Sequence, residues 1–229
     1  MKKIAIILSF FLGISLNGIS QEVGYGITIG GNISGIIETN EQLFLDSKMG
    51  FQVGAYVDYY FNQNVYLKGD LIFITKGAYS SAKATSWTES NISAEIYTDI
   101  NPMYLQIPAI VGYYWDLKNG LGLNFELGGY FALGIAGKAV SRVTINETDI
   151  IDVNINYFKN SDKPNELYLG NNSRVDYGLR FGVGAMLNKH LSLAFHFDLG
   201  LHNIYNDKYV EKYYSKRNYS TLLTLGYRF

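Results

Sequence analysis

Strict alternation of side chains runs to the last residue of the chain, and it restricts the fold more than any other feature. Within residues 219–229, one set of alternate positions holds Tyr219, Thr221, Leu223, Leu225, Tyr227 and Phe229. The other set holds Ser220, Leu222, Thr224, Gly226 and Arg228. A period of two indicates an extended strand with one apolar face. A strand that ends on an aromatic residue is typical of transmembrane β-barrels, in which terminal aromatics anchor the closing strand at the bilayer interface.

The amino terminus has the parts of a secretory signal peptide. Lys2 and Lys3 form a basic start, Ile4 to Leu16 form an apolar run, and the small residue Ser20 comes before the expected cleavage point. The apolar run is shorter than the roughly 20 residues that a spanning helix needs. We therefore predict a signal peptide over residues 1–20 and an outer-membrane β-barrel domain over residues 21–229.

Composition excludes several other classes. The chain has 24 Gly, 20 Tyr and 3 Pro, which favours a glycine-rich and tyrosine-rich β protein. A formal net charge of -1 argues against a nucleic-acid partner, because phosphate binding needs a clustered basic surface. The chain has no cysteine, so disulfides, thiol chemistry and a lipoprotein anchor are not expected.

Eight segments of the mature chain alternate as the last one does, and each is long enough to cross a bilayer as a tilted strand of about 9 to 11 residues. They run over about 23–35, 50–62, 65–77, 103–115, 121–136, 174–187, 190–203 and 219–229. Short turns follow the second, fourth and sixth segments, whereas 36–49, 78–102, 137–173 and 204–216 are longer connections. This pattern is typical of short periplasmic turns and long external loops. We predict an all-β fold, an eight-stranded antiparallel up-and-down transmembrane β-barrel with long extracellular loops, in the bacterial outer membrane.

The face opposite the apolar one predicts the content of the barrel. It carries nearly balanced charges of both signs, separated by glycines: Asp58, Lys68, Asp70, Lys76, Glu126, Asp176, Arg180, His196, Asp198 and Arg228. The apolar face is the more continuous of the two, so we assign it to lipid rather than to a soluble core. Because an isolated charge away from water is costly, we predict a paired network in the lumen. Eight strands leave room only for side chains, so the network should close the lumen.

Aromatic clusters end the second, fourth and eighth segments. They contain Tyr59, Phe61, Tyr113, Trp115, Tyr227 and Phe229. Aromatic residues gather where a membrane meets water, so we predict that these side chains form a periplasmic girdle. We also predict that Phe229 helps the barrel-assembly machinery to recognise the chain.

The chain resembles the PorT-like outer-membrane β-barrel family in the order and spacing of several stretches. These are GYGITIGGNISGI, FQVGAYVDYYF with a later KGA, YLQIPAIVGYYW, RVDYGLRFGVGAM, LGLHNIYND and the terminal LGYRF. The resemblance covers nearly the whole mature chain apart from the long loops. It implies an eight-stranded barrel in the outer membrane; most members have no assigned activity, and one branch is associated with the assembly of a protein secretion system. Pro108 fits the family pattern inside a predicted strand, where it suggests a bulge.

Two other classes of function stay open beside a non-enzymatic structural, binding or secretion-assembly role. A rim enzyme acting on lipid or peptide would use His202, with Asp198 below it and a loop serine such as Ser80, Ser81 or Ser141. A narrow pore is the second alternative. His190, His196 and His202 are each six residues apart, which at about 3.4 Å per residue is too far for a shared metal ion. We expect no catalytic residue, cofactor or metal.

The longest external segment contains two further alternating stretches, Val140 to Ile145 and Ile150 to Tyr157. Polar residues interrupt both, which favours a strand continuation or a small hairpin outside the membrane over two more spanning strands. We expect the acids of this segment, Glu147, Asp149 and Asp152, to be solvated rather than to hold a cation. An unpaired strand edge invites a partner strand, so this segment is the best candidate for docking an unidentified protein.

Overall fold

The computed structural model describes residues 22–38, 46–85, 93–117, 120–145, 148–158, 172–188, 190–205 and 215–229. They form one antiparallel sheet of ten strands: β1 (Glu22–Glu38), β2 (Asp46–Tyr60), β3 (Val65–Thr75), β4 (Ala78–Thr85), β5 (Ser93–Asp116), β6 (Leu121–Ile145), β7 (Thr148–Asn156), β8 (Val175–Leu187), β9 (Leu191–Gly200) and β10 (Lys216–Arg228). The predicted signal peptide lies outside the described residues. Among the residues that are described, no helix has the length and apolarity to cross a bilayer.

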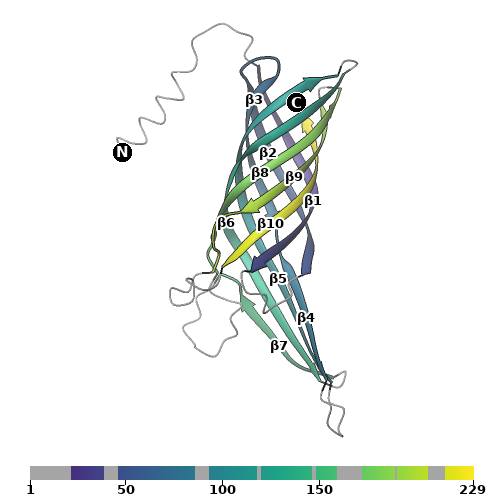
Figure 1. The fold of residues 1–229 in the computed structure, drawn as a ribbon, viewed down its shortest axis with the longest axis vertical. Helices are drawn as coiled ribbons and strands as arrows, with labels where there is room; N and C mark the ends of the chain where they lie inside the picture. The colour runs from purple at the N-terminus through teal and green to yellow at the C-terminus, as the bar shows by residue number, and fades with distance from the viewer. Residues whose placement is uncertain are drawn as a thin grey trace, which may run out of the picture.

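Eight of the strands close into a ring, as predicted. The ring runs β1–β2–β3–β5–β6–β8–β9–β10 and returns to β1, with every pair antiparallel. Closure gives each of these strands two neighbours, so their backbone N–H and C=O groups are paired within the sheet. Figure 1 shows the tilted strands of the ring, with the carboxy terminus at the end that carries the short turns.

Side-chain alternation separates an apolar outer wall from a filled interior. On β10, Leu223 and Leu225 are exposed, whereas Leu222 and Thr224 are buried. Neighbouring strands continue the outer surface, because Leu223 lies opposite Phe195 and Leu225 opposite Leu193. A continuous exposed apolar surface of this kind is unfavourable in water and suits a hydrocarbon environment. The predicted assignment of the two faces is therefore confirmed.

A four-stranded sheet continues beyond the ring at the end opposite the carboxy terminus (Figure 1). There β4 pairs with the first part of β5, β5 with the end of β6, and β6 with β7. The small hairpin predicted over about 140–157 is present, since the fifth predicted strand continues to Ile145 of β6 and pairs with β7; the sixth predicted strand does not continue outward, because β8 begins at Val175. The prediction that residues 78–102 are only a loop is wrong, because β4 and the start of β5 lie there. These stretches carry polar residues on both faces, so their alternation is weak in the sequence.

Polar contacts hold the base of this external sheet against the ring. Lys48 of β2 forms an ion pair with Asp99 of β5 and also donates a hydrogen bond to Asn101. Within the sheet, the hydroxyls of Thr98 and Ser141 are 2.9 Å apart across the β5–β6 pair. We infer that the orientation of the external sheet is set by side chains as well as by the backbone ladder.

A β-bulge marks the level at which the sheet leaves the ring. Met103 lies opposite Ala136 and Tyr104 opposite Gly134, which leaves Ile135 of β6 as the extra residue. The predicted bulge at Pro108 is wrong. Pro108 stays opposite Tyr130 in an unbroken β5–β6 register. Proline removes one backbone donor without adding a residue, so the register need not shift.

Apolar side chains also fill part of the interior, toward the long connections. The buried cluster contains Ile36, Ile72, Ile74, Ala78, Ile100, Tyr104, Tyr130, Ala132, Ala139, Tyr157, Phe158, Ile204 and Leu222. From the sequence we expected mainly charged and small residues inside. The interior instead combines this apolar cluster, near the external end, with buried charged groups.

Candidate functional site

The predicted lumen residues all lie on the inner side of the wall. Eight of them are buried, and the side chains of Lys68 and Arg228 are 13% and 12% exposed. Asp176 and Asp198 are 0% exposed, so neither carboxylate has water to stabilise it. Each therefore needs a partner within the barrel.

Arg180 and Asp198 form the central pair. They lie opposite each other on β8 and β9, and Nε and Nη2 of Arg180 are 2.6 and 2.7 Å from the two carboxylate oxygens of Asp198. Gln106 of β5 donates a third hydrogen bond to Asp198, at 2.7 Å. This two-point geometry is the strong form of an Arg–carboxylate contact. The Gln106 bond reaches across the lumen, because β5 and β9 are not neighbours in the ring.

A second group lies around Glu126, toward the short turns. The Glu126 carboxylate accepts hydrogen bonds from the Tyr66 hydroxyl at 2.7 Å and from Nζ of Lys68 at 3.2 Å. Nε2 of His196 is 2.8 Å from its other oxygen. Nearer the end of the barrel, Nη2 of Arg228 is 3.2 Å from Asp58. Charges of both signs are therefore paired through this half of the lumen.

A third group faces the external end. Nζ of Lys76 is 3.1 Å from Asp176, and Asn218 donates to the same carboxylate oxygen at 3.0 Å. The Lys76 ammonium also lies over the rings of Tyr104 and Tyr130, 5.2 and 4.7 Å from their centroids. These rings compensate part of the lost hydration of the cation.

Asp70 is the least paired of the predicted set. It is buried in the lumen, but its Oδ1 has no hydrogen-bond partner among the described residues. A cavity of about 30 Å³ lies nearby in the lumen, and Lys68, Glu126 and His196 are among its lining residues. A space of this size has room for only a few water molecules.

Close packing in the lumen explains part of the glycine content. Gly112 lies opposite Tyr66, and a Cβ atom on this glycine would be 2.1 Å from the Tyr66 ring. The Tyr66 ring can lie where its hydroxyl donates to Glu126 only because no side chain stands at position 112.

Neutral side chains that complete the network were not among the predicted site residues. They are Gln52, Tyr66, Gln106, Tyr104, Tyr130, Thr224 and Asn218. All lie on the inner side of strands whose faces had already been assigned. The signal in the sequence that would have identified these residues is their position on the inner face of a strand.

The geometry does not form the arrangement weighed for a rim enzyme. Arg180 and Gln106 occupy the carboxylate oxygens of Asp198. Nε2 of His202 is instead 3.3 Å from Ser173, and its ring lies 5.0 Å from that of Tyr177, whose side chain is on the outer wall. Continued alternation along 190–203 would place His202 on the inner face with His196, but β9 ends at Gly200 and the alternation stops there. Among the described residues, no group of His, Asp and Glu could hold a metal ion.

The predicted girdle residues lie at the end with the short turns. Phe61, Tyr113, Trp115, Tyr227 and Phe229 are exposed, and Tyr59 is half-buried against Phe61 at a ring distance of 5.1 Å. Tyr25 was not predicted for this set, yet its exposed ring stacks on Phe229 at 5.6 Å. The interfacial role of these rings and the role of Phe229 in assembly stay predictions.

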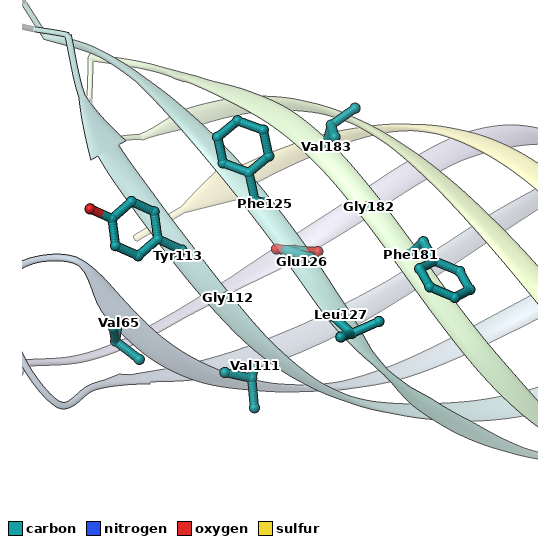
Figure 2. A pocket seen from close by; sticks show the side chains of 10 residues that line it. All are labelled: Val65, Val111, Gly112, Tyr113, Phe125, Glu126, Leu127, Phe181, Gly182 and Val183. Atoms are coloured by element: carbon teal, nitrogen blue, oxygen red, sulfur yellow. The ribbon is translucent and has the colours of Figure 1, made fainter.

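A hollow of about 510 Å³ lies on the outer wall (Figure 2). Its lining residues are Val65, Val111, Gly112, Tyr113, Phe125, Glu126, Leu127, Phe181, Gly182 and Val183. Gly112, Glu126 and Gly182 are in register across β5, β6 and β8, and apolar side chains flank this row. The Glu126 carboxylate bonds to lumen residues, so the hollow presents an apolar surface toward lipid.

Comparison with known proteins agrees with this architecture. A family described as "Outer membrane protein beta-barrel domain" matches residues 17–206. The chain is similar to the structure of Ail from Yersinia pestis in complex with the heparin analogue sucrose octasulfate, with 17% identity, 91% of this chain and 99% of that chain covered, and a TM-score of 0.41.

Two further solved structures show similar coverage. Neisserial surface protein A has 12% identity, with 90% of this chain and 97% of that chain covered and a TM-score of 0.39. OprG from Pseudomonas aeruginosa has 12% identity, 90% and 96% coverage and a TM-score of 0.41. No curated protein matches the chain.

Proposed function

Since the chain belongs to the outer membrane protein beta-barrel domain family and lies in the bacterial outer membrane, we propose that it is a non-enzymatic binding scaffold. In this proposal the closed barrel anchors the protein in the membrane, and the external sheet of β4 to β7 binds the partner. The observation that supports it most is the contrast between the two parts. Paired charges and apolar side chains fill the lumen, whereas the external sheet ends on an open strand edge.

The open edge belongs to β7. Among the described residues, β7 pairs with β6 alone, so its second row of backbone groups has no strand beside it. Proteins commonly protect such edges with charged residues, proline or β-bulges. Residues 148–156 contain no proline or lysine, although they include Asp149 and Asp152, and the β6–β7 register shifts between Val143 and Thr144. An extended segment of another protein could add to the rest of this edge through backbone hydrogen bonds, with side-chain contacts giving selectivity.

We propose a protein partner that supplies such a strand. The resemblance to PorT-like barrels, one branch of which is associated with assembly of a secretion system, supports a component of an envelope secretion machinery. A pore function has less support, because paired charges and apolar side chains fill the lumen, and the cavity beside Lys68, Glu126 and His196 holds only a few water molecules. An enzymatic function has less support because His202 and Asp198 bond to different groups.

Site-specific photocrosslinking in intact envelopes tests the proposal. A photoreactive residue replaces Asn154, which is exposed on β7, and in a matched variant it replaces Asn62, which is exposed in a short turn at the other end. We expect a discrete protein adduct at position 154 that is absent at position 62. Excising residues 142–156 should remove partner binding and leave a folded, heat-modifiable barrel.

The proposal would be contradicted if positions 154 and 62 gave the same set of crosslinked proteins. Loss of folding on excision would also contradict it, since it would place the segment in the barrel wall. Partner binding that survives excision would remove β7 as the docking element.

A further inference from the structure

The chain turns back into the external mouth of the barrel directly after β7. Tyr157 and Phe158 are only 2% and 6% exposed, although the strand before them projects beyond the ring. The backbone N–H of Tyr157 donates to the carbonyl of Gly137 on β6 at 3.1 Å, and the side-chain amide of Asn172 donates to the carbonyl of Tyr157 at 3.1 Å. The backbone of Tyr157 is therefore held between β6 and the segment that leads into β8.

The Phe158 ring occupies a socket built around Gly134. A Cβ atom on Gly134 would lie 2.3 Å from the ring, so the absence of a side chain there makes the space that the ring fills. Tyr104 meets the ring edge to face, with centroids 5.6 Å apart. Arg174 covers it at 5.2 Å and donates a hydrogen bond to the carbonyl of Gly134 at 2.9 Å. The Tyr157 ring is a further neighbour, with its centroid 5.0 Å from that of Phe158, so two aromatic rings and one cation hold the Phe158 ring.

The charged interior begins one layer below this socket. Tyr104, whose ring meets Phe158, also lies under the Lys76 ammonium. Lys76 and Asp176 are 3% and 0% exposed. Losing either partner of such a buried pair would leave an uncompensated charge. The Phe158 ring packs on the same Tyr104 ring that Lys76 contacts, so removing it would open space for water next to this pair from the external side.

We infer that Tyr157 and Phe158 form a latch that closes the external mouth of the barrel and ties the docking strand β7 to it. The inference goes beyond the proposed function, because it assigns closure of the lumen to two residues of the external segment. Removing the ring from its socket opens the lumen to water and frees the carboxy-terminal end of β7. The same two residues then both close the lumen and hold the end of β7 in place.

Cysteine accessibility tests the latch, because the natural chain contains no cysteine. Ala132 is 0% exposed, lies in the same buried cluster as Phe158 and is opposite Asp176. An Ala132→Cys variant in detergent micelles is treated with a charged, water-soluble methanethiosulfonate reagent. With Phe158→Ala added, we expect labelling to be faster by about tenfold or more, since local opening controls access to a buried group.

Two comparisons make the result specific. Tyr177→Ala removes an aromatic ring from the outer wall near the same end, and should leave the labelling rate unchanged; Phe158→Leu should restore slow labelling in part.

If Phe158→Ala does not give a heat-modifiable barrel, Gly134→Ala serves instead, because the added Cβ displaces the ring without deleting it. Labelling in a folded Phe158→Ala or Gly134→Ala variant at the rate of the Tyr177→Ala control would overturn the inference. This outcome would leave the crosslinking result at Asn154 unaffected.

Discussion

Arg180 and Asp198 stabilise the barrel only as a pair. Both are at most 1% exposed, so removing one leaves an uncompensated charge in the lumen. We predict that Arg180→Leu lowers the free energy of unfolding by about 3 to 5 kcal/mol. The double variant Arg180→Leu with Asp198→Leu should recover most of this loss, as urea-dependent unfolding in micelles would show. Equal losses in the single and double variants would mean that packing, rather than charge pairing, dominates at this level of the lumen.

On the outer wall, the cost of a lysine substitution should depend on how deep the position lies in the bilayer. Leu223 lies near the middle of β10 and is 56% exposed, whereas Tyr227 lies on the same face near its end. Lysine at position 223 should cost about 2 to 4 kcal/mol, and lysine at position 227 about 0 to 1 kcal/mol. Reversible folding into lipid vesicles measures both values. A cost that is the same at the two positions would show that the apolar face does not cross the bilayer as assigned.

Which residues face the lumen could be predicted from the sequence, but not which residues bond to each other. A period of two places Glu126 and His196 on inner faces. The partners depend on the register between strands far apart in the chain, and on the tilt that brings opposite walls together. Glu126 could have met Arg180 instead of Lys68 and His196 without changing the alternation. His202 shows the opposite limit, since counting by twos gives the wrong face once a strand has ended.

At the scale of elements, the ring strands were predictable because lipid enforces their pattern. Each must present an unbroken apolar face, which leaves a strong signal in the sequence. The strands β4 and β7 have water available on both sides, and their side chains are under a weaker constraint. The hairpin around β7 was still visible in its alternating residues. The strand β4 was not, because Ser80 and Ser81 give little contrast between its two faces.

The difference between these elements should appear in amide hydrogen exchange. Ring strands have two neighbours each, whereas β7 has one among the described residues. Because locally exposed hydrogen bonds open with low free energy, we predict that β7 exchanges faster than β10 by about tenfold or more. Mass-spectrometric exchange on the barrel in micelles checks this, with peptides from β10 as the internal control. Protection of β7 equal to that of β10 would indicate that its free edge is already covered.

At the scale of the whole molecule, one chain combines an apolar barrel surface, which suits lipid, with an external sheet, which suits water. The barrel has an apolar exterior and an interior filled by polar and apolar side chains, and the external sheet has an open edge among the described residues. The bulge between Met103 and Tyr104 joins them, as it lies where β5 and β6 leave the ring. A continuous pair of long strands therefore transmits the rigid frame of the barrel to the external sheet. This arrangement suits a protein that holds a binding edge at a fixed position outside the membrane.

The central claim is that the barrel is a closed anchor and not a channel. Single-channel recording of the purified chain in planar bilayers tests it most directly, with a porin inserted under the same conditions as the positive control. The filled lumen predicts no stable unitary conductance for the wild-type chain at any salt concentration, although its insertion is verified by heat-modifiability of the recovered protein. Reproducible conductance steps that increase with salt concentration would contradict the account.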